Sequence, residues 1–387
     1  MTDDTEEAAE VTPYEVSSKF GSQDDYDRLI DKFGANRLNE DLLDRLRSHS
    51  DGELHQFFRR DIICSHRDFA QILDKYEEGD EFYLYTGRAP SGDLHLGHVL
   101  PFELTRYLQE TFDVKLVVQV PDEEKFLFKD GLTLDDTRRY GIRNIEDILA
   151  LGFDPDKTDI FFNMDYAGEL YPTAVEISRQ ITFSQVKATM GFENSTNIGS
   201  IFYTAMQATP AFLGSVQNDE NKHCLVPLAI DQDPHFRLSR DVAPKLGYPK
   251  PSILHMKFLP SLQGRGKMSS SKKHTFVGLR DSIEEAKEKI DRAKTGGQVT
   301  AEEQREKGAN PDDDMVFQLM AYLLVDDDDE LNELYEQYAS GEILSGELKQ
   351  ICKDYLEDFL VEHQRRREEV KDNIDEYLVS NTDQIDW

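Results

Sequence analysis

Apolar positions in the middle of the chain follow two different spacings, which predict alternating strands and helices. The stretches 81–86 (EFYLYT) and 115–120 (KLVVQV) are rich in aromatic and β-branched residues and predict strands. Between them, apolar residues recur at helical spacing and predict a helix over 99–112. A helical stretch then precedes a strand at 159–164, and the nearly continuous apolar run at 224–231 suits a buried parallel strand. Strands that alternate with helices in this way indicate an α/β fold with a parallel, doubly wound sheet.

The two ends of the chain show helical patterns only. Short amphipathic helices are expected at 25–33, 42–48 and 69–80, before the first predicted strand. From about residue 281 onward, no further strand is predicted. One helical stripe near the C-terminus consists of Leu348, Ile351, Cys352, Tyr355, Leu356, Phe359 and Leu360. The C-terminal part is therefore expected to be a helical domain.

These patterns divide the chain into four parts. Residues 1–12 carry much charge and few apolar side chains, and are expected to be a disordered acidic tail. Residues 13–77 form a mostly helical extension, residues 78–280 the α/β domain, and residues 281–387 the helical domain. With 387 residues, the chain is long enough to bury a large core in more than one domain.

The charge of the chain limits the surfaces that it can present. Its 77 Asp and Glu residues outnumber 44 Lys and Arg residues, which gives a formal net charge of −33. Such a charge excludes a protein whose whole surface binds nucleic acid electrostatically, so contact with nucleic acid requires a local basic patch. The acidic residues are spread along the chain, which is typical of halophilic proteins, because 1 M salt shortens the Debye length to about 3 Å and screens their repulsion.

The sequence predicts neither a membrane protein nor a secreted one. No segment approaches the apolar length of a membrane span, and the acidic N-terminus lacks the basic and apolar regions of a signal peptide. Cys64, Cys224 and Cys352 are scattered, and form neither a disulfide framework nor a metal-binding spacing. We therefore expect a cytoplasmic protein without membrane contact.

His95 and His98 lie on either side of Gly97, directly after a predicted strand and at the start of a predicted helix. Three interpretations are open: a pair without a role, a metal site and a nucleotide site. A metal site is disfavoured because no cysteine and no HExxH pattern accompanies the pair. A nucleotide site is favoured because the free backbone N–H groups and the dipole of a helix N-terminus attract phosphate. Gly97 has no side chain, so a flat base can lie against its backbone.

A second stretch, 264–274 (GRGKMSSSKKH), concentrates cations and hydroxyls after two glycines. Taken alone, it is compatible with a flexible basic surface loop. In a chain this acidic, however, three lysines and three serines within 267–273 are unusual. They suit the polyphosphate of ATP, because cations neutralise the departing pyrophosphate. The two stretches together therefore predict an ATP site.

The stretches HLGH at 95–98 and KMSSS at 267–271 resemble, in the expected order, the HIGH and KMSKS motifs of class I aminoacyl-tRNA synthetases. The chain more specifically resembles the tryptophan-specific members (tryptophanyl-tRNA synthetases) of archaeal and eukaryotic type. The runs that carry this resemblance cover nearly the whole chain after residue 12: FFRRDIICSHRDF, FYLYTGRAPSG, VVQVPDEEKFLFKD, ITFSQVKATMGF, AIDQDPHFR, SRDVAPKLGYPKP and VDDDDELNELYEQYASGEILSGELK. One departure is Ser270, where KMSKS has lysine, which leaves open whether Lys272 or Lys273 supplies the second positive charge.

The resemblance implies a tryptophan–tRNA ligase with a Rossmann-type catalytic domain, a helical anticodon-binding domain and a homodimeric assembly. Such an enzyme activates L-tryptophan with ATP to tryptophanyl-adenylate and pyrophosphate, then transfers tryptophan to the 3′ end of tRNA(Trp). No general base is needed, because the carboxylate of tryptophan is already ionised at pH 7. Mg²⁺ is expected to accompany ATP rather than to occupy an all-protein cage. Two rival classes are the sister tyrosine enzyme and a catalytically silent paralogue that only binds RNA or amino acid.

The resemblance also implies roles for individual residues. The expected catalytic residues are His95, His98 and Lys267, the last on a mobile loop that closes on ATP. The residues expected to contact ATP are Arg88, Gly97, Ala229, Met268, Ser269, Ser270, Ser271 and Lys272. The residues expected to bind tryptophan are Tyr85, Gln119, Glu124, Lys125, Gln207 and Gln232.

Within the tryptophan set, Tyr85 and Gln119 match the positions that hold the indole N–H. A tyrosine pocket would instead place an acidic acceptor near the substrate hydroxyl. Lys125 is expected near the substrate carboxylate, although it could also be a solvated charge. The matches for the ammonium group are Glu124, Gln207 and Gln232.

A local basic cluster, Arg365, Arg366 and Arg367, lies in the predicted helical domain. These side chains suit contacts with tRNA phosphates. Equally, they can form one face of a long helix and pair with Glu368 and Glu369. Both interpretations remain open from the sequence.

Overall fold

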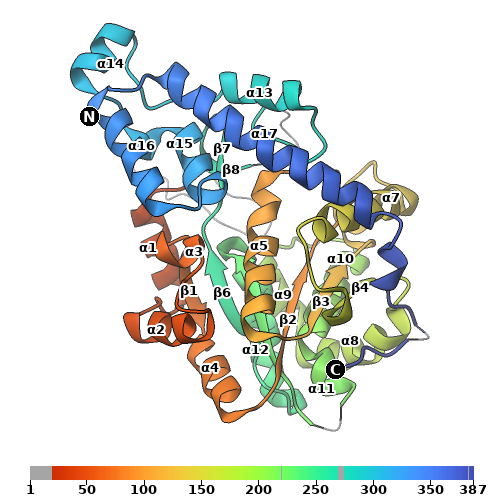
Figure 1. The fold of residues 1–387 in the computed structure, drawn as a ribbon. Coiled ribbons are helices and arrows are strands. Elements are labelled where there is room, and N and C mark those ends of the chain that lie inside the picture. Colours follow the sequence, from red (N-terminus) through yellow and green to blue (C-terminus); the bar gives the residue numbers. More distant parts are fainter. Residues whose placement is uncertain (1–19, 219, 269–273, 382) are drawn as a thin grey trace, which may run out of the picture.

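The computed structural model describes residues 20–218, 220–268, 274–381 and 383–387 (Figure 1). The predicted acidic tail over 1–12 lies outside these ranges. Four predicted ATP contacts also lie outside them, namely Ser269, Ser270, Ser271 and Lys272. Within the described ranges, no helix combines the length and the apolar run that a membrane span requires.

A six-stranded sheet forms the centre of the molecule, with the strand order β1-β6-β5-β2-β3-β4. Its parallel strands are β2 (Phe82–Gly87), β3 (Leu116–Val120), β4 (Thr158–Phe162), β5 (His223–Ala229) and β6 (Ser252–Met256). The edge strand β1 (Ile63–Arg67) pairs antiparallel with β6. The predicted α/β fold is confirmed. Two strands of this sheet were not predicted, namely the parallel strand β6 and the antiparallel edge strand β1, which comes from the range assigned to the helical extension.

The chain leaves the middle of the sheet in two directions. From β2 it continues to β3 and β4, whereas from β5, the other neighbour of β2, it continues to β6. The junction of β2 and β5 is therefore the topological switch point of the sheet. Open α/β sheets bind ligands at such a point, beyond the carboxyl ends of the strands.

Alternate side chains of the central strands pack into separate cores on the two faces of the sheet. Leu84 and Leu116 belong to one core, and Tyr83, Tyr85 and Val117 belong to the other. This division follows from the strand geometry, in which successive side chains point to opposite faces. It places Tyr85 and Gln119, which lie near the carboxyl ends of neighbouring strands, on the same face of the sheet.

Helices cover both faces of the sheet (Figure 1). Those before β2 are α1 (Gln23–Phe33), α2 (Glu40–His49), α3 (Gln56–Arg59) and α4 (Phe69–Glu78). Those of the α/β part are α5 (Leu96–Phe112), α6 (Glu124–Phe128), α7 (Leu134–Leu149), α8 (Ala167–Gln180), α9 (Phe183–Met190), α10 (Ile198–Ala208), α11 (Leu213–Val216) and α12 (Asp233–Leu246). A small hairpin of β7 (Pro260–Ser261) and β8 (Gly264–Lys267) follows β6.

Beyond residue 281, the regular structure of the described chain is helical, as predicted. The main helices there are α13 (Ile283–Asp291), α14 (Ala301–Lys307), α15 (Met315–Leu319), α16 (Asp328–Ser340) and α17 (Ser345–Val370). The long α17 packs against α13 and α7, so it joins the helical part to the α/β part.

The residues after α17 return to the α/β part. The N–H of Ile160 donates to the carbonyl oxygen of Tyr377 at 2.7 Å, and the N–H of Val379 donates to that of Ile160 at 2.9 Å. Trp387 packs edge-on against Tyr83, with ring centroids 4.7 Å apart. The C-terminal segment therefore lies along the outer edge of β4, although its residues fall within the range predicted as the helical domain.

Candidate active site

The segment after β2 brings both predicted histidines to the switch point of the sheet. His95 is the residue before α5, which begins three residues earlier than its apolar spacing predicts. The rings of His95 and His98 stack with centroids 3.6 Å apart. Burial lowers the pKa of His95 to about 3, and the charge of Arg88 acts in the same direction. Burial likewise lowers the pKa of His98, so both rings are neutral at pH 7.

Neutral histidines at this position can donate hydrogen bonds without a change of charge. The backbone N–H of His95 donates to Nδ1 of His98 at 3.2 Å, which leaves the ring proton of His98 on Nε2. Nδ1 of His95 is buried and has no hydrogen-bond partner among the described residues. An unpaired buried polar atom costs about 1–3 kcal/mol, so a ligand that supplies the partner is stabilised here. Across the described ranges, no three His, Cys, Asp or Glu side chains are grouped as a metal site.

Gly97 lies where the two predicted motifs meet. A Cβ atom at this position would lie 3.1 Å from Cε1 of His95 and 3.4 Å from Cβ of Met268. The chain after KMSSS also pairs with the histidine segment, because the N–H of Leu96 donates to the carbonyl oxygen of Val277 at 3.0 Å. The structure thus brings HLGH and the start of KMSSS together, although the two are far apart in sequence.

Lys267, in β8, contacts an acidic residue that the sequence analysis did not single out. Its Nζ lies 2.8 Å from Oδ2 of Asp231, whose side chain is buried. Burial raises the pKa of Asp231, and the charge of Lys267 opposes this effect. Oδ1 of Asp231 is buried and unpaired within the described structure. Asp231 lies between Ala229, which ends β5, and Gln232, which precedes α12, so its place in the predicted AIDQ segment was the available signal.

Arg88 follows β2 directly and adds a second cation to this region. Its backbone N–H donates to the carbonyl oxygen of Gln119 at 2.9 Å. Its Nε is buried, and the described chain offers it no hydrogen-bond partner. Burial lowers the pKa of the guanidinium to about 10, and the charge of Glu124 opposes this effect. Arg88 therefore remains protonated at pH 7, and a desolvated cation with an unpaired donor suits a phosphate oxygen.

Three of the residues predicted to bind tryptophan meet at the carboxyl ends of β2 and β3. The hydroxyl of Tyr85 donates to Oε1 of Gln119 at 2.6 Å. Nε2 of Gln207, from α10, lies 3.4 Å from the same hydroxyl. Tyr85 and Gln119 are both 1% exposed. Their oxygen atoms can accept a hydrogen bond from a buried donor, and the apolar ring of Tyr85 suits an aromatic ligand.

Glu124 and Lys125 form an ion pair at the start of α6, with Nζ 2.6 Å from Oε1. Glu124 is buried, and the side chain of Lys125 is only 18% exposed, so this lysine is not the fully solvated charge of the alternative interpretation. Burial lowers the pKa of His235, on α12, to about 4, and the charge of Glu124 opposes this effect. His235 is a second residue near the predicted set that the sequence analysis missed.

The predicted basic cluster lies on α17, and its three arginines have different surroundings. The guanidiniums of Arg365 and Arg366 both pair with Glu362, at 2.8 and 2.7 Å, and Arg365 also pairs with Glu369. Arg367 instead points to the α/β part, where its Nη1 lies 3.2 Å from Oδ1 of Asp147. Arg365 and Arg366 therefore remain accessible at the surface, whereas Arg367 joins α17 to α7.

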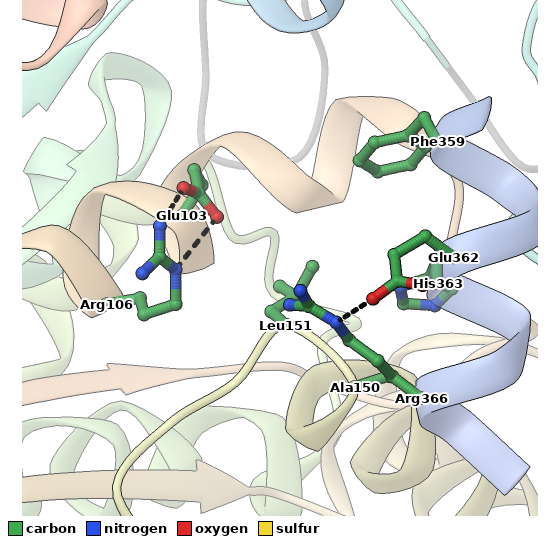
Figure 2. A pocket seen from close by; sticks show the side chains of 8 residues that line it. All are labelled: Glu103, Arg106, Ala150, Leu151, Phe359, Glu362, His363 and Arg366. Carbon is green, nitrogen blue, oxygen red and sulfur yellow. Dashed lines mark hydrogen bonds and ion pairs between the residues drawn. The ribbon is translucent and has the colours of Figure 1, made fainter.

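A cavity of about 360 Å³ lies between α5, the residues after α7, and α17. Its lining consists of Glu103, Arg106, Ala150, Leu151, Phe359, Glu362, His363 and Arg366. Figure 2 shows two ion pairs among its lining residues, Glu103 with Arg106 on α5 and Glu362 with Arg366 on α17. Of the predicted site residues it includes only Arg366, so it is separate from the region beyond β2 and β5.

The chain resembles proteins of known function along most of its length. The family model described as tRNA synthetases class I (W and Y) matches residues 77–361. The tryptophan–tRNA ligase of Pyrococcus furiosus is 47% identical over 374 residues, which cover 96% of this chain and 94% of the relative. That of Saccharolobus solfataricus is 46% identical over 364 residues, with 94% and 93% covered.

Solved structures give the same result. The tryptophanyl-tRNA synthetase of Plasmodium falciparum superposes with a TM-score of 0.85 at 39% identity, and the alignment covers 93% of this chain and 98% of that one. The tryptophanyl-tRNA synthetase of Encephalitozoon cuniculi, solved bound to tryptophan, superposes with a TM-score of 0.84 at 38% identity, with 92% and 98% covered.

Proposed function

This chain belongs to the class I tRNA synthetases for tryptophan and tyrosine, and from that membership we propose that it is the ligase that joins L-tryptophan to tRNA(Trp) with ATP. The observation that carries the choice of tryptophan is the pair of Tyr85 and Gln119, joined at 2.6 Å at the carboxyl ends of β2 and β3. A buried N–H donor needs such acceptors, because an unpaired polar group costs about 1–3 kcal/mol.

In the first half-reaction, the carboxylate of tryptophan attacks the α-phosphorus of ATP, and the bond to pyrophosphate breaks. The carboxylate is ionised at pH 7, so no side chain has to remove a proton. Catalysis then consists of orienting the reactants and of stabilising charge on the phosphates. The neutral rings of His95 and His98 donate hydrogen bonds at the N-terminus of α5, and Arg88 supplies a desolvated positive charge.

Lys267 is proposed to stabilise the departing pyrophosphate. In the structure its Nζ contacts Asp231 at 2.8 Å, so it exchanges a carboxylate oxygen for a phosphate oxygen when ATP binds. Gly97 is proposed to lie against the adenine. A side chain at this position would meet His95 and Met268, so close packing here requires glycine. Mg²⁺, bound to the phosphates of ATP, would neutralise part of their charge.

For the amino-acid substrate, Glu124, Gln207 and Gln232 are proposed to hold the ammonium group, and Lys125 the carboxylate. Glu124 is buried and lies next to Lys125, so the two supply opposite charges side by side. A zwitterionic amino acid carries the same two charges. Binding therefore replaces the ion pair of Glu124 with Lys125 by two ion pairs with the substrate.

The amino acid is tested by ATP–pyrophosphate exchange in 1 M KCl with Mg²⁺, comparing tryptophan with tyrosine. Exchange that depends on tryptophan is the expected result. Exchange that depends on tyrosine would overturn the assignment of Tyr85 and Gln119 while leaving the reaction type. A folded protein that exchanges with neither amino acid would be the silent paralogue.

The assembly is proposed to be a homodimer. Its support is a set of exposed apolar side chains: Phe126, Met164, Tyr171, Val175 and Ile198. They lie on α6, after β4, and on α8 and α10, two helices that pack against each other. Ile198 is 84% exposed, which is unusual for a large apolar residue in a chain that is otherwise so acidic. Light scattering after size exclusion is expected to give twice the mass of one chain, and Ile198→Asp is expected to yield monomers.

The helical part beyond residue 281 is proposed to bind tRNA, with Arg365 and Arg366 as accessible cations. The net charge of −33 opposes long-range attraction of RNA, so direct contacts have to carry the recognition. We also propose a cytoplasmic location and adaptation to high salt. Melting curves across KCl concentrations are expected to show a rising Tm; equal or greater stability without salt would contradict the adaptation.

A further inference from the structure

A line of hydrogen bonds leads from the predicted indole site to a carboxyl group that the sequence analysis did not single out. The hydroxyl of Tyr85 donates to Oε1 of Gln119 at 2.6 Å. Nε2 of Gln119 donates to Oδ1 of Asn163 at 2.9 Å, and Nδ2 of Asn163 donates to Oε1 of Glu123 at 2.7 Å. We call these four residues the relay. They come from β2, β3, the residue after β4 and the residue before α6.

The relay is shielded from water. Gln119 and Asn163 are each 1% exposed, so water does not compete for their amide groups. The second carboxyl oxygen of Glu123, Oε2, is buried and has no hydrogen-bond partner in the described ranges. Burial raises the pKa of Glu123 to about 7, although the hydrogen bond from Asn163 opposes this effect. The carboxyl group of Glu123 therefore loses part of its hydration free energy at its place at the end of the relay.

The carboxyl group gives the relay its direction. A side-chain amide has a donor end and an acceptor end of nearly the same shape, so packing alone does not decide which way it lies. The ionised carboxylate of Glu123 only accepts, so above pH 7 its Oε1 selects the NH₂ of Asn163. The oxygen of Asn163 then selects the NH₂ of Gln119, which leaves the oxygen of Gln119 for Tyr85.

The direction matters for what the pocket offers to a ligand. In the observed relay, the hydroxyl of Tyr85 donates its hydrogen bond to Oε1 of Gln119. The remaining lone pairs of the Tyr85 hydroxyl oxygen and of Oε1 of Gln119 can then accept from a ligand. If the amide of Gln119 turned over, its NH₂ would face Tyr85 and the pocket. A ligand N–H would then meet a donor instead of an acceptor.

We propose that Glu123 and Asn163 are positioning residues that set the preference of this enzyme for a substrate with an indole N–H, by holding Gln119 with its oxygen toward Tyr85. The proposal rests on the proposed function, in which Tyr85 and Gln119 receive that N–H. Neither positioning residue has to touch tryptophan. They act by orienting the amide of Gln119, which is proposed to touch tryptophan.

The test compares two substrates in ATP–pyrophosphate exchange, using the full chain in 1 M KCl. One is L-tryptophan and the other is 3-(3-benzothienyl)-L-alanine, in which sulfur replaces the indole N–H. The ratio of their kcat/KM values reports recognition of the N–H, and general damage to the enzyme lowers both values together. Glu123→Gln keeps the shape of the side chain but can donate as well as accept, so it removes the direction of the relay.

Glu123→Gln is expected to lower the ratio about fivefold, the equivalent of one hydrogen bond between neutral groups. The double variant Glu123→Gln with Asn163→Asp moves the acceptor-only group to the middle of the relay, where it still selects the NH₂ of Gln119. It is expected to restore the ratio. The matched control is Glu103→Gln, a mostly buried glutamate on α5 that pairs with Arg106 and His55, and it is expected to leave the ratio unchanged.

A ratio that is unchanged in Glu123→Gln, or that the double variant does not restore, would overturn the proposal and leave Glu123 with a structural role only. Should Glu123→Gln not fold, Asn163→Ala cuts the relay in the middle and decides the same question, because an unchanged ratio there also overturns it. Failure of the proposed function is visible earlier, since wild-type protein would then not activate tryptophan or would not distinguish it from the analogue.

Discussion

The two ends of the candidate active site differ in how completely their polar groups are paired. At the indole end, Tyr85 and Gln119 belong to the relay, in which each amide of Gln119 and Asn163 has both a donor and an acceptor contact. The relay leaves one buried atom unpaired in the described chain, Oε2 of Glu123 at its far end, whereas the phosphate end has three such atoms. These are Nδ1 of His95, Nε of Arg88 and Oδ1 of Asp231.

This difference follows from what each end has to do. Discrimination between amino acids requires acceptors that are already oriented before the substrate arrives, because a site that can reorient accepts the wrong ligand as well. Stabilisation of phosphate charge requires donors and cations that remain available until the charge develops. In the proposed function, the relay would meet the first requirement. The unpaired nitrogens of His95 and Arg88, together with Lys267 held by Asp231, would meet the second.

The largest effect is expected at the phosphate end. Lys267→Ala removes the cation proposed to face pyrophosphate, and is expected to lower the exchange rate about 100- to 1,000-fold. The KM for tryptophan should stay the same, because Lys267 lies outside the relay. Lys245→Ala, at the end of α12, is the control. A rise in the KM for tryptophan equal to the loss of rate would show that the two ends are not separate.

At the indole end, Tyr85→Phe removes one acceptor and is expected to lower kcat/KM for tryptophan about tenfold. The KM for ATP should not change. Tyr83→Phe is a matched control, because its hydroxyl is also buried but donates to the carbonyl oxygen of Pro210 at 3.0 Å. Equal losses in the two variants would attribute the effect to packing rather than to recognition.

A smaller change is expected where the two motifs meet. Gly97→Ala places a methyl group 3.1 Å from His95, and is expected to raise the KM for ATP about fivefold, in line with moderate overpacking. Steady-state kinetics with tryptophan saturating would measure it. Gly92→Ala, in the same segment but facing open space, should behave as wild type. An effect on the KM for tryptophan alone would contradict this placement of Gly97.

The smallest effect concerns the pH dependence of stability. The pKa of His95 is about 3 in the folded protein, below the value of 6.5 for a free histidine. As the pH falls through 6.5, the unfolded chain binds a proton that the folded chain does not bind, so the free energy of unfolding decreases. His95→Gln is expected to reduce this slope by one proton, about 1.4 kcal/mol per pH unit.

Urea unfolding between pH 4 and 8 would measure the slope, with His274→Gln at an exposed position as the matched control. A slope unchanged by His95→Gln would mean that His95 binds protons equally in the folded and unfolded chains, so that its pKa lies near 6.5 in the folded protein. Its ring would then become charged below that pH, and the neutral state assigned to it at the phosphate end would hold only above that pH.

Some elements were predictable because their signal is local. The strands β2, β3 and β4 agree with short runs rich in aromatic and β-branched residues, and β5 agrees with a continuous apolar run. The helix α17 agrees with its helical stripe. The strand β1 was missed because its five residues, ICSHR, show neither a long apolar run nor a clear alternation. The start of α5 was missed by three residues, since Gly97 and His98 in its first turn interrupt the apolar pattern.

Only some of the residues of the candidate site were predicted from the sequence. His95, His98 and Lys267 were recognisable from short motifs, whereas Asp231 was passed over inside the AIDQ segment that was otherwise used. Glu123 and Asn163 carry no motif of their own. Their importance depends on which atoms they contact, and the three bonds of the relay join residues 34, 44 and 40 positions apart.

By itself, the sequence determined the α/β class, the helices on either side of the central strands, the net acidic charge and the two motifs, because periodicity, composition and short motifs are properties of neighbouring residues. Only the tertiary structure decided that HLGH meets KMSSS at Gly97, that Asp231 holds Lys267, and that a carboxyl group orients the amide beside Tyr85. These features are contacts between distant segments. A hydrogen bond depends on the positions of two atoms within a few tenths of an ångström, and the packing of the sheet and its helices sets those positions.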